Sequence, residues 1–175
     1  MAGFVRGIMG NMESKAESFL KNLLINTHVI DAAQTVGVKK IVAMGTVAAY
    51  PDPAPAYPIT EDMIWSGAPH TSENSYGQAK RAMLAMLQAY QESYGLPFVF
   101  AISTNLYGPY DNFDVKHGHV IPSLIRKFYE AKCDGGTVTV WGDGSAQRDF
   151  MYIDDTAAAL VACMERAQWA GIPSV

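Results

Sequence analysis

The sequence has few charged residues, and its positive charges form no run. Only 17% of its 175 residues are Asp, Glu, Lys or Arg, and the formal net charge is -4. A surface that binds nucleic acid needs clustered Lys and Arg, so we predict no nucleic-acid partner. Hydrophobic residues make up 49% of the chain, a composition typical of a globular protein and not of a disordered one.

Long apolar segments and paired cysteines are also missing. No apolar run approaches the roughly 20 residues that span a bilayer, so we predict no membrane partner. Cys133 and Cys163 lack the spacing of a disulfide framework or a zinc motif. Two histidines in the segment His117–His119, without a third ligand nearby, do not make a metal site. We therefore predict reduced thiols, a cytoplasmic location and no metal.

The hydrophobic pattern alternates between helical spacing and short continuous apolar runs. Helices are predicted over about 13–36, 74–94, 119–132 and 154–167, and strands over 38–44, 98–102, 137–141 and 148–153. Residues 50–74 hold five of the nine prolines and are predicted to be mostly loop, as is the polar segment 105–118. Buried strands that alternate with helices indicate an α/β fold with a parallel sheet.

Tyr76 and Lys80 have the spacing of a catalytic pair. Residues four apart on a helix share one face, with Cβ atoms about 5–6 Å apart. An ammonium beside a phenol favours the phenolate and should lower the phenol's pKa from its usual value near 10. A carbonyl reductase needs such an acid to protonate the oxygen. The spacing alone is common, and most such pairs are two exposed side chains.

Three predicted strand ends could surround this pair, because ligands of open parallel sheets bind at the carboxyl ends of the strands. They are Gly45–Thr46, Ser103–Asn105 and the turn after Trp141. The Thr46 hydroxyl could hydrogen-bond the Tyr76 phenol or a substrate oxygen. It could equally be a hydroxyl that satisfies a turn.

Several motifs in order resemble the GDP-L-fucose synthase family, in the extended, sugar-nucleotide-modifying branch of the short-chain dehydrogenases/reductases. The resemblance covers nearly the whole chain. It rests on Tyr76–Lys80 and on Gly45–Pro51, Thr104–Phe113, His119–Pro122 and Val140–Phe150. It implies a partial Rossmann-like, doubly wound parallel sheet with the start of a smaller substrate domain.

The resemblance implies a role for each matching residue. Tyr76 would protonate the C4 oxygen of a GDP-4-keto-6-deoxy-hexose, with Lys80 lowering its pKa and Thr46 in the position of the family's Ser/Thr. His119 would be the acid of the epimerisation and would neighbour the cofactor. The cofactor, NADP(H) with NAD(H) not excluded, would contact Gly45, Thr46, Tyr76, Lys80, Ser103, Thr104, Asn105, Leu106 and His119. The GDP-sugar would contact Lys127, Trp141 and Arg148. A homodimer would form through helices of about 13–36 and 74–94.

The sequence departs from the family at three places. Ala48 stands where the family has the cysteine that serves epimerisation, so reduction is better supported than epimerisation. Ser103 stands where the family usually has proline. The Gly-rich turn that holds the cofactor pyrophosphate at a helix N-terminus is missing before Gly45. We therefore interpret residues 1–175 as the central part of a longer enzyme. About 1–110 would belong to the dinucleotide-binding domain, and about 111–175 would mix substrate-domain and returning Rossmann elements.

Other interpretations stay open at this point. His119 could simply begin a helix, Lys127 could lie on a solvated face, Trp141 could be core, and Arg148 could pair with Asp149 at the surface. The chain could also be an NAD-dependent sugar-nucleotide 4-epimerase. A third alternative is a catalytically silent fragment that only binds a partner or a nucleotide sugar.

Overall fold

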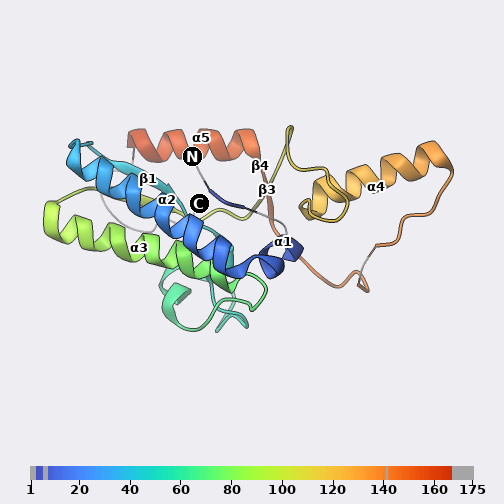
Figure 1. Cartoon of the computed structure of the whole chain (residues 1–175), viewed down its shortest axis with the longest axis horizontal. Coiled ribbons are helices and arrows are strands. Elements are labelled where there is room, and N and C mark those ends of the chain that lie inside the picture. The colour runs from blue at the N-terminus through green and yellow to red at the C-terminus, as the bar shows by residue number, and fades with distance from the viewer. Residues whose placement is uncertain (1–2, 6–7, 141, 167–175) are drawn as a thin grey trace.

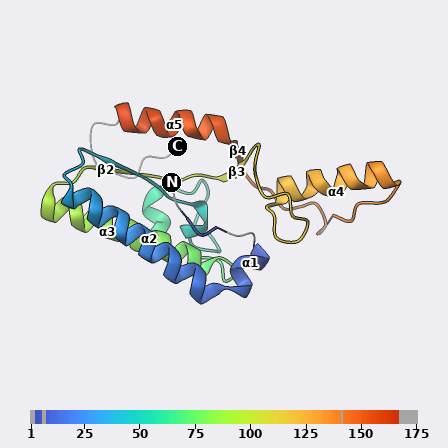
Figure 2. The same ribbon diagram turned by 45° about the horizontal axis from the view of Figure 1, so that its top comes forward.

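The computed structural model describes residues 3–5, 8–140 and 142–166. At its centre, β1 (Ile41–Met44) and β2 (Phe98–Ala101) run parallel, in register from Ile41 opposite Phe98 to Met44 opposite Ala101. Helices α2 (Lys15–Thr35) and α3 (Asn74–Tyr94) lie on one face of this pair, and α5 (Ile153–Arg166) lies on the other (Figure 1 and Figure 2). Because β2 is covered on both faces, all four of its residues are buried, which explains its continuous apolar sequence.

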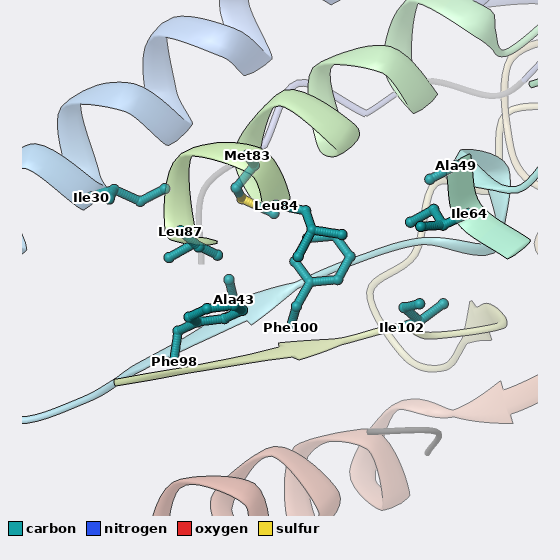
Figure 3. Close-up of a cluster of buried hydrophobic side chains, with 10 residues drawn as sticks. All are labelled: Ile30, Ala43, Ala49, Ile64, Met83, Leu84, Leu87, Phe98, Phe100 and Ile102. Carbon is teal, nitrogen blue, oxygen red and sulfur yellow. The ribbon is translucent and has the colours of Figure 1, made fainter. Parts of the chain in front are cut away.

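The hydrophobic core fills the space between the strand pair and the two helices. Figure 3 shows Leu84 and Leu87 of α3 pointing toward the strands, where Phe98 and Phe100 face them. Phe100, Leu84 and Ile64 are fully buried. Burying a side chain of this size stabilises the fold by roughly 1.5–3 kcal/mol, so this cluster fixes α3 to the strand pair.

A second parallel pair forms from β3 (Asn105–Tyr107) and β4 (Phe150–Tyr152). Helix α4 (Val120–Asp134) lies between them in sequence and extends away from α2, α3 and α5 in both views (Figure 1 and Figure 2). The division of the chain near residue 110 stays a prediction.

The predicted helices are observed within one or two residues of their expected bounds. A further helix, α1 (Ile8–Glu13), was not predicted. In the predicted loop 50–74 the structure has only the 3₁₀ helix η2 (Glu61–Trp65) and a bridge between Pro51 and Pro69. Two strand predictions need correction. Residues 105–118 were expected to be loop but contain β3, and the described part of the predicted strand 137–141 forms no strand. High β-propensity in Thr137–Val140 is not enough without a neighbouring strand to pair with.

None of the helices formed by the described residues is both long enough and apolar enough to cross a membrane.

Candidate active site

Helix α3 places Tyr76 and Lys80 one turn apart and next to the end of β1. The Lys80 Nζ lies 5.7 Å from the centre of the Tyr76 ring. It also donates a hydrogen bond of 2.9 Å to the carbonyl oxygen of Met44, the last residue of β1. The Lys80 residue is only 6% exposed. The predicted pair is therefore brought together, and its ammonium is anchored to the strand end.

Gly45 and the extended Thr46 connect β1 to a short 3₁₀ helix. The Gly45 N–H donates to the Ala101 carbonyl oxygen at 2.7 Å, and a Cβ on Gly45 would lie 2.6 Å from Phe100 Cε1. Only glycine lets the backbone pass so close to that ring. The Thr46 Oγ1 then accepts a bond of 3.2 Å from the Ala48 N–H and caps the 3₁₀ helix η1 (Val47–Ala49). A hydroxyl that accepts this bond still has its own O–H to donate.

Helix α3 touches the turn after β1 directly. A Cβ on Gly77 would lie 2.4 Å from the Ala48 carbonyl oxygen, and the Arg81 Nε donates to the Ala49 carbonyl oxygen at 2.7 Å. Neither residue was predicted from the sequence to belong to the site. A glycine inside a predicted helix costs about 1 kcal/mol relative to alanine, so the glycine at position 77 could have indicated close packing there. Nothing in the sequence distinguished Arg81.

Burial shifts the pKa values of Tyr76 and Lys80 in opposite directions, each toward the neutral form. It raises the pKa of Tyr76 to about 12, with a smaller contribution from the nearby Glu73 carboxylate. It lowers the pKa of Lys80 to about 8. The sequence predicted that Lys80 would lower the pKa of Tyr76, and for this structure that prediction is wrong. Loss of water around the phenol outweighs the attraction of an ammonium 5.7 Å from the ring centre.

The end of β2 leads into the predicted cofactor-binding segment from Ser103 to Leu106. The Ser103 carbonyl oxygen accepts a bond of 3.1 Å from the Val47 N–H, so this residue adjoins η1. Thr104 follows and is half-buried. The Asn105 backbone N–H and Nδ2 both donate to the Asp149 carbonyl oxygen, at 3.3 and 3.1 Å.

Leu106 lies in β3, opposite Met151 of β4. Of the four residues in the segment, Ser103 is thus the one tied by a hydrogen bond to the turn after β1, while Asn105 and Leu106 pair with the β4 side.

The remaining predicted site residues lie on or near α4 and before β4. His119 occupies the N-cap position of α4, and its Nδ1 lies 3.3 Å from Asp111 Oδ1. Lys127 is half-buried in α4, which lies apart from α3 (Figure 1). Arg148 is exposed and donates to the neighbouring Gln147 carbonyl oxygen. Trp141 lies outside the described residues. The structure does not bring Lys127 next to Tyr76 and Lys80.

Histidine and acidic side chains near His119 do not form a metal centre. His117 Nδ1 lies 3.2 Å from Asp114 Oδ1, and its Nε2 lies 3.9 Å from Glu13 Oε2. Among residues 3–5, 8–140 and 142–166, no group of three or more His, Cys, Asp or Glu side chains could hold a metal ion.

Parallel strands between helical layers, with a Tyr-x-x-x-Lys pair at a strand end, are the features expected of the extended short-chain dehydrogenase/reductase class. Residues 1–173 match the NAD dependent epimerase/dehydratase family, and the chain belongs to this family. The α/β, Rossmann-like fold class predicted from the sequence is confirmed.

Within this family the chain is similar to GDP-L-fucose synthases, as its motifs predicted. It is 40% identical over 161 residues to the enzyme of Sinorhizobium fredii, covering 91% of this chain and 51% of that protein. A GDP-L-fucose synthetase from Naegleria fowleri, solved with NADP bound, superposes with a TM-score of 0.84 at 33% identity over 99% of this chain and 57% of that one. A Campylobacter jejuni GDP-mannoheptose C4 reductase with NADP bound gives 0.83 at 27% identity, over 94% and 57%. The chain spans about half the length of the curated relatives it matches.

The raised pKa of Tyr76 can be measured by comparing the alkaline absorbance titrations of the wild type and the Tyr76→Phe variant. The difference between the two titrations should show no phenolate absorbance below pH 10, and this absorbance should rise toward pH 12. Since the folded-state pKa lies above the unfolded value of about 10, the neutral phenol stabilises the fold below pH 10, and this contribution is lost as pH rises through 12. A Tyr76 phenolate that forms below pH 10 would show that Lys80, and not burial, dominates.

Proposed function

We propose that this chain carries the catalytic pair of an NADP(H)-dependent sugar-nucleotide reductase/epimerase, which reduces the 4-keto group of a GDP-4-keto-6-deoxy-hexose. The observation that carries the proposal is the Tyr76–Lys80 pair, held by a hydrogen bond of 2.9 Å to the end of β1. Relatives at about 40% identity named GDP-L-fucose synthase support the substrate class. Structural neighbours with NADP bound support the cofactor.

In this proposal Tyr76 is the acid that protonates the sugar oxygen. A phenol with a pKa of about 12 is fully protonated at neutral pH, so its proton is available to donate. Lys80, with a pKa of about 8, is largely an ammonium at pH 7 and can stabilise the phenolate that the transfer leaves behind. The Thr46 hydroxyl at the adjacent strand end would donate a second hydrogen bond to the same sugar oxygen.

The residues of this chain fit the nicotinamide end of the cofactor. When bound, NADPH supplies the hydride. The Lys80 ammonium has three N–H donors and its bond to Met44 uses one, so it can also hold ribose hydroxyls. Gly45, Thr46, Tyr76 and the segment Ser103–Leu106 would line the same end, with His119 beside them. No G-x-x-G-x-x-G spacing for the pyrophosphate precedes Gly45 in the sequence, and NAD(H) stays an alternative to NADP(H).

The GDP-sugar would be held by Lys127, Trp141 and Arg148, with His119 as the epimerisation acid. Arginine suits a diphosphate because its planar fork gives two parallel hydrogen bonds. Arg148 is exposed, and its one described hydrogen bond goes to the adjacent Gln147, so its guanidinium can reorient toward a ligand. These roles rest on the motifs around the residues.

A homodimer through α2 and α3 completes the proposal. Helix α2 buries several polar side chains, while four of its large apolar side chains are exposed. Those exposed are Phe19, Leu20, Leu24 and Val29, and those buried include Ser18, Asn22 and Asn26. An apolar surface of this kind on a helix that already packs against α3 is typical of a protein–protein interface.

Replacing Tyr76 by phenylalanine should abolish NADPH oxidation with a GDP-4-keto-6-deoxy sugar. Loss of a general acid typically lowers the rate by 10²–10⁴-fold, and the decrease should fall on kcat because the ring that packs in the site is kept. Absorbance at the nicotinamide band gives the rate. Tyr94→Phe is the matched control, since Tyr94 is 61% exposed at the far end of α3 and should keep wild-type activity. Equal rates for wild type and Tyr76→Phe would contradict the proposal.

Epimerisation should be weak in this chain and should rise in the Ala48→Cys variant. An alanine cannot take or return a proton, and each acid–base group typically contributes 10²–10⁴-fold. NMR of the sugar in deuterated water measures exchange at C3 and C5. Reduction by NADPH serves as the internal control, because Ala48→Cys should change it little. Rapid C3/C5 exchange in the wild type would show that another residue replaces the cysteine.

Light scattering at micromolar concentration should give twice the mass of one chain. A Leu20→Glu/Leu24→Glu variant should give the monomer mass, because two carboxylates in an apolar interface cannot be desolvated without large cost. As a control, Ile125→Glu on α4, which is 54% exposed, should leave the dimer intact. A wild-type monomer would count against the dimer proposal.

A further inference from the structure

Arg81 is a buried cation that the proposed chemistry does not use. It follows Lys80 on α3 and is only 7% exposed. Its Nε donates to the Ala49 carbonyl oxygen at 2.7 Å, and its guanidinium carbon lies 5.9 Å from the centre of the Trp65 ring, which covers it from the η2 side. Its Nη2 is buried with no hydrogen-bond partner in the part of the chain that the structure describes.

Arg81 stabilises the fold less than its burial suggests. A buried charge is costly unless it is paired and hydrogen-bonded, and the ion pairs among the described residues do not include Arg81. A leucine or methionine here would fill similar space without that cost. The hydrogen bond to Ala49 is the specific contribution that an apolar side chain could not make.

The bond to Ala49 acts on the turn that carries Thr46. The Ala49 N–H donates to the Thr46 carbonyl oxygen at 3.1 Å, and the Ala48 N–H donates to the Thr46 Oγ1 at 3.2 Å. The position of the Ala49 carbonyl and the direction of the Thr46 hydroxyl are therefore set by one small hydrogen-bonded unit. Arg81 holds this unit from α3, the same helix that carries Tyr76.

Helix α3 holds the segment Met44–Ala49 at both ends. Lys80 bonds the Met44 carbonyl at the start, Arg81 bonds the Ala49 carbonyl at the end, and Gly77 lets the Ala48 carbonyl approach the helix between them. Tyr76 and Thr46 are thus on two elements joined by two hydrogen bonds and one close backbone contact.

We propose that Arg81 is a positioning residue for the reduction: it clamps the turn Thr46–Ala49 against α3 and so fixes the Thr46 hydroxyl relative to the Tyr76 phenol. The clamp itself depends only on the structure. Its effect on catalysis rests on the function proposed above.

The test compares Arg81→Met, which keeps the aliphatic stem but removes the donors, with Arg81→Lys, which keeps a cationic donor. Arg166→Met is the matched control, because Arg166 is an exposed arginine in the last turn of α5.

The first measurement is hydrogen exchange of single backbone amides, by NMR. In Arg81→Met the amides of Ala48, Ala49 and Tyr50 should exchange about 10-fold faster, the effect of losing one charge-assisted hydrogen bond. The Gly95 amide at the far end of α3 should not change.

The second measurement is steady-state NADPH oxidation, below the unfolding midpoint of each variant. Arg81→Met should lower kcat by about 10–100-fold, the effect of a displacement of the order of 1 Å in the site. The KM for NADPH should change less than kcat, and Arg81→Lys should recover part of the loss. If Arg81 only supported the fold, Arg81→Met would lower the melting temperature. In that case kcat would not fall more than the KM for NADPH changes, and Arg81→Lys would not recover kcat.

Unchanged exchange at Ala48–Tyr50 in Arg81→Met would overturn the clamp, and wild-type kcat in that variant would overturn the positioning role. Inactivity of the wild type toward every 4-keto GDP-sugar is a different outcome. It would count against the proposed function, and the exchange measurement would then decide the clamp alone.

Discussion

The contact between the first turns of α3 and the segment that follows β1 is the constraint on which the candidate site depends. It is possible because Gly77 has no side chain, so the Ala48 carbonyl can approach to a distance where a Cβ would clash. Beneath this contact, Leu84 and Leu87 of the same helix are packed on Phe98 and Phe100 (Figure 3). The core packing therefore fixes the direction of the α3 axis, and the contact at Gly77 fixes the distance between α3 and the segment that follows β1. Tyr76 and Lys80 owe their position to both.

Lys80 and Arg81 are two consecutive buried cations on α3. Each gives its hydrogen bond to a backbone carbonyl of one short segment, Met44 for Lys80 and Ala49 for Arg81. Carbonyl dipoles compensate a buried cation less than a carboxylate would, and this leaves the Lys80 pKa low enough to respond to its surroundings. A carboxylate partner would have locked the ammonium in place. The Lys80 pKa can therefore shift when its surroundings change. Burying the two cations costs stability, and the hydrophobic core beneath them offsets that cost.

The sequence predicted the helices and the Tyr76–Lys80 proximity better than it predicted burial. Helical spacing was enough for α3, which begins at Asn74 and ends at Tyr94 as expected, with the left-handed Gly95 as its C-cap. They also located the Tyr76–Lys80 pair, because spacing along one helix determines proximity. Spacing does not determine burial, and the direction of the Tyr76 pKa shift depends on burial. It was therefore predicted with the wrong sign.

Pairing between distant segments was the second limit. The strand Asn105–Tyr107 is short and begins with a polar residue, so nothing local distinguished it from loop, and it forms because Phe150–Tyr152 lies beside it. Thr137–Val140 has the better local signal and forms no strand. Arg81 illustrates the same limit for the site, since its importance lies in a carbonyl 32 positions away in the sequence. The roles of His119, Lys127 and Arg148 depend on how their segments meet a substrate, and they stay predictions.

The high pKa of Tyr76 is compatible with its proposed role as the acid. An alkoxide that forms at a reduced carbonyl is about as basic as hydroxide, and bulk water has a pKa of about 15.7. A phenol with a pKa of about 12 is still the stronger acid, so proton transfer to the sugar oxygen runs downhill. In the reverse direction a phenolate would have to form first, and burial opposes it at neutral pH. The raised pKa therefore keeps the Tyr76 proton in place at neutral pH, where the phenol can donate it to the sugar oxygen.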